Sequence, residues 1–284
     1  MTQRILVVLD PDSDTPVATD TAIDIARLTG GEVTGLAFVD KDSIGSDTAG
    51  GGIGSMYFAA RLREQLTEET REKAKALITA FTTRVEAQGV AHSGDRVGEG
   101  ELVKSLLDEM RTHDLLVAGR ESHFYYAEPE RRTHTLGKVL QDAAAATLIV
   151  GTERPTVRRV AVAYDGSGPS ARAMQKFAHL APFGTDLDVE VVHVRGGSEA
   201  DVLASDRLRE DAAAYLRAHG FERITTTAIE SSDPANRICE LAQGDRADLV
   251  VSGAFAKKGF RKMLFGSSAT KLLEQATVPL FLYH

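Results

Sequence analysis

Two glycines and two hydroxyl side chains near the end of the chain have the spacing of an anion-binding turn. The apolar segment 248–253 ends at Gly253, and Gly266-Ser267-Ser268 follows after twelve further residues. A helix that begins here presents main-chain N–H groups without partners and partial positive charge, which a phosphate would satisfy. Glycine lets a phosphate oxygen approach the main chain because it has no Cβ. The segment therefore predicts a phosphate-binding turn between a strand and a helix.

A simpler interpretation of the same residues remains open. Ser267 and Ser268 could serve only as a helix cap, and short glycine motifs often occur without a ligand. The basic residues between the two glycines could be a solvated surface; they are Lys257, Lys258, Arg261 and Lys262.

The sequence contains an internal repeat of two similar halves, and the strands and helices of this repeat would position the motif. The segment 4–10, which ends in Asp10, matches 159–165, which ends in Asp165. The segment 114–119 likewise matches 248–253. Arg154-Pro155 marks the junction, so we expect two domains, 1–154 and 155–284, with a linker too short for the halves to be independent.

Apolar segments alternate with helical patterns in both copies, which is typical of a parallel sheet covered on both faces. We expect α/β architecture: two doubly wound open parallel five-stranded sheets, of order 3-2-1-4-5, packed as a pseudo-dimer. The expected strands are 4–9, 32–39, 90–97, 114–118 and 147–151, then 159–164, 187–195, 223–229, 248–252 and 279–283. The expected helices are 15–29, 56–88, 100–112 and 136–145, then 169–181, 200–218, 234–243 and 267–275.

This strand order brings a second group of residues to the glycine motif. Ligands of open parallel sheets bind beyond the carboxyl ends of the strands, where the strand order reverses. Asp165 ends the first strand of the second copy and Gly253 ends the fourth, so we expect both in one crevice. A carboxylate there could accept hydrogen bonds from a ribose or adenine edge, or help to hold Mg²⁺. Asp165-Gly166-Ser167 could also be only a turn before a helix.

Composition excludes several classes of function. The net charge of -8 argues against a broad nucleic-acid or anionic-membrane surface. The single Cys239 cannot form an internal disulfide, and we expect it in the core. The chain enters a strand without a signal-peptide pattern and has no run of eighteen apolar residues. We therefore expect a cytoplasmic protein with no membrane or nucleic-acid partner.

With these residues in place, the chain resembles a tandem universal stress protein over nearly its whole length. The matching segments are 162–167, 193–194, 248–253, 266–267 and 276–280. ATP-binding members have a loop of glycine, two residues, glycine, nine residues, then glycine with Ser or Thr. Here Gly253, Ala256 and Gly266-Ser267 keep the spacing, but Ala256 replaces the second glycine. The added methyl group puts phosphate approach in doubt.

The resemblance implies a role for each matching position. Asp165 would lie near the ribose or adenine, and Val194 would offer its main chain to the adenine. Around the phosphates would stand the loop and helix-start positions Gly253, Ala256, Gly266, Ser267 and Ser268. The implied ligand is ATP, with or without Mg²⁺. Family members also dimerise through their last strands, so 278–282 is expected to pair with 148–150 within this chain; a further homodimer stays open.

The first copy is a poorer match to the phosphate loop. Asp10 and Val39 are the expected base-side positions, but seventeen residues separate Gly119 from Gly137, and Lys138 stands where a hydroxyl would be. Glu128 and Glu130 would repel a phosphate. We expect the first half to bind no ATP, or a different ligand, with the aromatic residues 124–126 covering a pocket or packing on the other half. The glycine-rich stretch 41–55 has no second-copy counterpart and is expected to be a lid or flexible excursion rather than a phosphate loop.

No pattern indicates a metal site or an enzyme. Four histidines lie in the first half without the close spacing of a zinc site, and His193 is expected to be satisfied by core hydrogen bonds. The chain has no Gly-x-Ser-x-Gly elbow and no Walker lysine, so at most slow ATP hydrolysis is expected. Two functions remain: a nucleotide-binding regulatory protein, or a universal stress protein that acts as a ligand-free interaction module. An enzyme on this fold is a weaker third.

Overall fold

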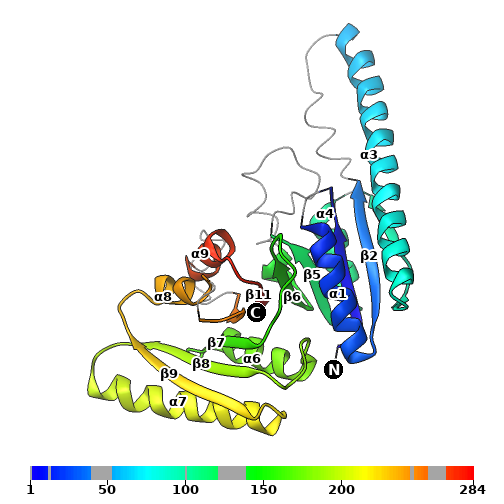
Figure 1. Cartoon of the computed structure of the whole chain (residues 1–284). Helices are drawn as coiled ribbons and strands as arrows, with labels where there is room; N and C mark the ends of the chain where they lie inside the picture. The colour runs from blue at the N-terminus through cyan, green and yellow to red at the C-terminus, as the bar shows by residue number, and fades with distance from the viewer. Residues whose placement is uncertain are drawn as a thin grey trace.

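The computed structural model describes residues 2–11, 14–39, 53–99, 101–120, 139–243, 246–254 and 267–284, without the side chains of 53–56 and 267–270. The strands form one sheet of order β3-β2-β1-β5-β6-β11-β10-β7-β8-β9, and β4 pairs with β2 beside β3 (Figure 1). The predicted α/β fold is therefore confirmed, with the order 3-2-1-4-5 in each half.

The two halves contribute similar elements. The first contains β1 (Arg4–Leu9), α1 (Thr15–Thr29), β2 (Glu32–Val39), α3 (Ile53–Ala87), β3 (Ala91–His92), β4 (Arg96–Glu99), α4 (Leu102–Met110), β5 (Leu115–Gly119) and β6 (Ala146–Val150), and residues 139–142 are helical. The second contains β7 (Arg159–Ala163), α6 (Gly168–Leu180), β8 (Asp188–Arg195), α7 (Glu199–Ala218), β9 (Arg223–Glu230), α8 (Pro234–Leu241), β10 (Leu249–Gly253), α9 (Ser267–Gln275) and β11 (Leu280–Tyr283). The predicted domain boundary between 154 and 155 falls between β6 and β7 and stays a prediction.

The last strands of the two halves pair directly. β11 runs antiparallel to β6, with Leu280 opposite Ile149 and Phe281 opposite Leu148. This is the pairing that the family resemblance implied, and it joins the two expected five-stranded sheets into a single continuous sheet. Because β6 and β11 are antiparallel, the carboxyl ends of the parallel strands point to opposite edges of the sheet in the two halves.

Arg120, which follows the end of β5, stabilises the junction between β6 and β11. Its guanidinium donates hydrogen bonds to the carbonyl oxygens of Ala276 and Val278, and the Nη2–O distance to Val278 is 2.5 Å. These carbonyls follow the C-terminus of α9, where positive charge is favourable. The first residue after Gly119 is therefore engaged by the opposite half.

Helices cover both faces of the sheet, as predicted. One apolar core lies under α1, α3, α6 and α7, and it is continuous across both halves. Phe177 of α6 stacks in this core on Phe221 and meets the ring of Phe281 edge to face, with centroids 5.6 and 5.5 Å apart. The other core lies under α4, α8 and α9 and contains the buried Cys239.

The third strand of the first half is broken, which the sequence did not predict. β3 and β4 replace the expected strand 90–97, and both pair with β2. Glu32 pairs with Ala91 but Leu36 pairs with Arg96, so one extra residue is inserted between the two strands. Gly94 lies in this insertion with a φ of 64°, a left-handed conformation that favours glycine.

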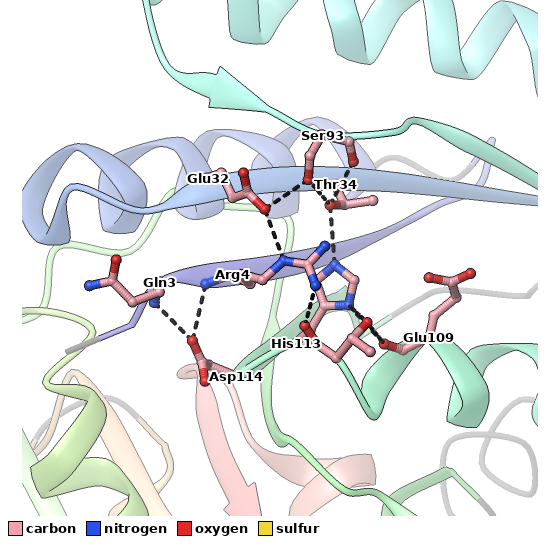
Figure 2. Close-up of polar contacts among 9 residues, drawn as sticks. Gln3, Arg4, Glu32, Thr34, Ser93, Glu109, His113 and Asp114 are labelled. Carbon is pink, nitrogen blue, oxygen red and sulfur yellow. Dashed lines mark hydrogen bonds and ion pairs between the residues drawn. The ribbon is translucent and has the colours of Figure 1, made fainter.

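An aspartate anchors the start of the first strand in each half. This shared role explains why the aspartate occurs at the same position of both halves. The main-chain N–H groups of Gln3 and Arg4 donate to Oδ2 of Asp114, at 2.9 and 3.1 Å (Figure 2). Asp248 accepts in the same way from Arg158 and Arg159, at 3.1 and 2.8 Å. The carboxylate before the fourth strand thus fixes the amino end of the first.

His113 is buried in a polar network at this amino edge (Figure 2). Its Nδ1 lies 2.8 Å from the carbonyl oxygen of Glu109, so Nδ1 carries a proton, and Nε2 lies 3.1 Å from Oγ1 of Thr34. The Thr34 hydroxyl donates to the carbonyl oxygen of Ser93, at 2.9 Å. Desolvation is the main cause that lowers the pKa of His113, which favours the neutral imidazole.

We predict that Asp248→Ala lowers the free energy of unfolding by about 1–3 kcal/mol, because two main-chain donors and Arg159 lose an ionised acceptor. The matched control is Asp186→Ala, whose almost fully exposed carboxylate pairs with Arg223 at the surface and should cost less than about 1 kcal/mol. Urea unfolding measures both. Equal losses in the two variants would show that the anchor contributes nothing beyond a surface ion pair.

We predict that His113 makes the protein less stable as the pH falls below about 6.5. The pKa of His113 is lower in the folded protein than in the unfolded chain. As the pH falls, the unfolded chain therefore takes up the proton first, and the free energy of unfolding decreases once the pH is below the unfolded-state pKa. His113→Gln should therefore weaken the dependence of unfolding free energy on pH, measured by urea titration at about pH 7.5 and about pH 5.5. An unchanged pH dependence in the variant would contradict this role; His193 and His284, whose pKa values are also lowered, contribute equally to both proteins.

Candidate functional site

The predicted site residues of the second half lie at one edge of the sheet. β7 has β10 on one side and β8 on the other, so the first and fourth strands are neighbours where the chain order reverses. Asp165 follows the end of β7, Val194 lies near the end of β8, and Gly253 is the last residue of β10. α9 begins at Ser267, and because it precedes the parallel strand β11, its first turn belongs to this edge too.

Part of the predicted loop cannot be placed. Ala256 and Gly266 lie outside the described residues, and Ser267 and Ser268 are described only as the first main-chain positions of α9. The effect of alanine at position 256 therefore stays a prediction.

Asp165 is an ionised, accessible carboxylate at the start of α6. Its Oδ1 accepts a hydrogen bond from the main-chain N–H of Ser167, at 2.9 Å, and Ser167 caps the helix through Ser170. Desolvation alone would raise the pKa of Asp165, but the hydrogen bonds from Ser167 and Ser170 outweigh it, and the pKa is lowered. The carboxylate has further acceptor capacity, so it could receive a ligand hydroxyl or amine.

Val194 presents main-chain groups toward the same place. The carbonyl oxygen of Val192 accepts from the N–H of Tyr164, at 2.9 Å, so Val192 hydrogen-bonds toward β7. Alternate residues of a parallel strand face the same neighbour. Val194 therefore faces the same side, beyond the last β7 residue, Ala163.

Gly253 has a packing reason for its missing side chain. A Cβ at this position would lie 2.7 Å from the main chain of both Pro169 and Ser170, so a larger residue would force β10 away from α6. The bare Cα thus seats the strand end against the start of α6. Its role in giving a phosphate access to the main chain stays a prediction.

His193 is satisfied inside the protein, as expected. Its Nδ1 lies 2.8 Å from Oγ of Ser205, a buried residue of α7, and Arg209 donates to the same oxygen. Desolvation is the main cause that lowers the pKa of His193, although the charge of Asp165 opposes it. The histidine therefore joins β8 to α7 and offers no obvious acid or base.

The first half has a different arrangement at its carboxyl edge. Asp10 is buried and accepts a hydrogen bond from the Thr15 hydroxyl, at 2.8 Å. A Cβ at Gly119 would overlap the carboxylate of Asp14, which is fully buried. Asp14 follows Asp10 by four residues, as Pro169 follows Asp165, so a carboxylate replaces a proline beside the strand-end glycine.

The sequence placed the repelling charges of the first half at Glu128 and Glu130, which lie outside the described residues. It missed Asp14, although an alignment of the two strand ends would have paired this acid with Pro169. The ladders also correct one equivalence. Arg4 pairs with Glu32 and Arg159 with Asp188, so Phe38 and not Val39 is the counterpart of Val194.

The described residues contain no group of three or more His, Cys, Asp or Glu side chains that could hold a metal ion. No helix within the described ranges is long and apolar enough to cross a membrane.

Comparisons with known proteins agree with the fold. Residues 156–284 match the Universal stress protein family. A universal stress protein of Synechocystis sp. is 21% identical over 269 residues, which cover 91% of this chain and 92% of that protein. A universal stress protein of Methanocaldococcus jannaschii is 27% identical over 136 residues, which cover 43% of this chain and 79% of that protein.

A solved universal stress protein from Archaeoglobus fulgidus has the same architecture. It superposes with a TM-score of 0.74 at 17% sequence identity, covering 99% of this chain and 95% of its own. At that identity the likeness shows a shared fold and does not extend to a ligand. Residues 156–284 therefore carry the sequence pattern of the Universal stress protein family, and the first half repeats the fold of the second.

Proposed function

We propose that this protein is a cytoplasmic stress-response regulator that binds an adenine nucleotide, ATP, in its second half. The observation that carries this is the convergence of Asp165, the main chain of Val194 and the start of α9 at the carboxyl edge, where the strand order reverses. Ligands of open parallel sheets bind at this kind of edge.

Each group has a role that its chemistry suits. The Asp165 carboxylate accepts hydrogen bonds from the ribose hydroxyls or the adenine amine, and the main chain of Val194 can pair with the adenine edge. The first turn of α9 supplies N–H groups and partial positive charge for the phosphates, with Gly266, Ser267 and Ser268 at the contact. The start of α6 already holds Asp165 through the Ser167 N–H, which leaves α9 as the helix for the phosphates. A Mg²⁺ ion would add charge balance beside them.

In this proposal the nucleotide is a signal and not a substrate. Bound ATP would order the edge formed by the ends of β7, β8 and β10 and so change the surface offered to a regulatory partner. A phosphate cradle gives some electrostatic assistance to hydrolysis, so slow turnover is compatible with the proposal.

The alternative is a universal stress protein that acts without nucleotide, as an interaction module. Two observations favour it: packing against α6 accounts for the bare Cα of Gly253, and Ala256 stands where ATP-binding members have glycine. In this case the second half would keep the fold and lose the ligand.

We predict that the purified full-length protein binds ATP and that Asp165→Asn weakens binding about 10- to 100-fold, the value of a hydrogen bond to a charged group. Gly266→Val, which adds a side chain to the residue before Ser267 in the sequence, should abolish binding. Isothermal titration calorimetry measures the affinity, and Asp186→Asn, at the opposite end of β8, is the control that should bind like wild type. Absence of binding in the wild type would favour the interaction module.

We also predict one ATP per chain. The buried side chain of Asp14 fills the space beside Gly119 in the first half, where a phosphate would have to approach. Native mass spectrometry of the full chain with excess ATP should therefore show a single adduct, which disappears in the Gly266→Val variant. A second adduct, or an adduct that survives this substitution, would contradict the assignment of binding to the second half.

A further inference from the structure

The helix α3 is much longer than its counterpart in the second half. Each helix connects the second strand of its half to the third, but α3 has 35 residues and α7 has 20. The second half thus covers its strands with α7, a helix fifteen residues shorter than α3. At a rise of about 1.5 Å per residue, the excess corresponds to about 22 Å of helix.

The excess lies at the amino end of α3, which projects beyond the sheet (Figure 1). The later part of the helix packs on the core through the buried side chains of Ala74, Phe81 and Val85. The residues from Tyr57 to Gln65 are exposed, except for the partly exposed Ala59. Residues 57–72, which precede this packed part and end where Arg71 pairs with Glu99 of β4, are called the α3 arm below.

The α3 arm carries large apolar side chains in water. Phe58 is 72% exposed and Leu62 is 48% exposed, and Leu66 is partly exposed one turn further. A spacing of four residues places these three side chains on one helix face. The same four-residue spacing leads on to the buried Ala74, so the stripe continues the core-facing side of α3 beyond the sheet, where Phe58 and Leu62 stay exposed. An exposed apolar stripe of this kind indicates a partner.

The distribution of charge along the α3 arm favours a second copy of the same arm as its partner, with the two helices antiparallel. Residues 57–63 contain two arginines and no acidic residue, whereas residues 64–72 contain four glutamates and one arginine. A second copy of the arm, lying antiparallel, would place the basic end of each helix against the acidic end of the other. A parallel arrangement would place like charges together.

We propose that the α3 arm is a self-association surface, through which two copies of this chain pair as an antiparallel two-helix contact. The two-fold axis would pass near residue 64. Leu62 would then pack against Leu66 of the partner subunit, and Arg61 would lie beside Glu68 of the partner subunit. Such a contact is isologous, so each of these interactions occurs twice. Because the contact spans only a few helical turns, it should be weak, with a Kd in about the micromolar range.

The first test is sedimentation velocity of the full-length chain across a concentration series that spans about 1–200 µM, the range in which so small an interface should associate. We expect a monomer–dimer equilibrium in the wild type. Arg61→Glu or Glu68→Arg should each weaken the dimer at least about tenfold, and the double variant, which restores opposite charges, should recover most of the loss. Circular dichroism checks that each variant keeps the wild-type helix content.

Three results of this test would overturn the proposal: a monomer at every concentration, a dimer that neither single substitution weakens, or a double variant no better than the single ones. A monomer would leave the stripe to another protein or to a segment of this chain outside the described residues.

The second test fixes the direction of the helices. Gln65→Cys lies near the proposed two-fold axis, so two copies should form an intermolecular disulfide under mild oxidation. In Glu72→Cys the two thiols would be about 24 Å apart along the paired helices, and this variant should stay uncrosslinked. The native Cys239 is buried and serves as a silent background. Crosslinking at position 72 but not at 65 would overturn the antiparallel arrangement.

Discussion

The antiparallel pairing of β6 with β11 is the interaction on which the rest of the structure depends. Every residue of β6 is buried, and Leu280, Phe281 and Leu282 of β11 are fully buried. Strands this apolar would be costly as exposed edges, because their main-chain groups and side chains would face water and other chains. Their pairing closes both edges at once and produces one core that runs under both halves.

The direction of this pairing also determines where ligands can bind. Because the two fifth strands are antiparallel, the carboxyl edge of the second half faces away from the carboxyl edge of the first. The two potential sites are therefore separate, and one can change without the other. Arg120 adds a further difference between the two carboxyl edges. It follows Gly119 in the first half, and its guanidinium donates hydrogen bonds to the carbonyl oxygens of Ala276 and Val278.

The amino edge is conserved between the halves and the carboxyl edge has diverged. Asp114 and Asp248 anchor their first strands by the same pair of main-chain hydrogen bonds, which stabilise the fold in both halves. At the carboxyl edge, Asp14 stands where the second half has Pro169, and Arg120 stands where it has Ala254. The repeat thus preserves what folding requires and varies what a ligand would meet.

Local patterns were sufficient to predict most of the fold. Apolar runs of strand length, separated by helical periodicity, predicted the parallel strands, whereas the pairing of 278–282 with 148–150 was implied by the family resemblance. The sequence did not predict the insertion at Gly94 or the register that makes Phe38 the counterpart of Val194. Both depend on which residues lie opposite one another in distant strands, and no local pattern records that. The same limit explains the packing role of Gly253, whose neighbours Pro169 and Ser170 are more than eighty residues away in sequence.

Hydrogen exchange with and without ATP tests the central claim most directly, since it locates the nucleotide in a chain with two copies of the fold. The account predicts slower exchange at the start of α9, at 165–170 and around Val194, with no change at 10–15 or around Phe38. Protection in the first half, or equal protection in both halves, would contradict it.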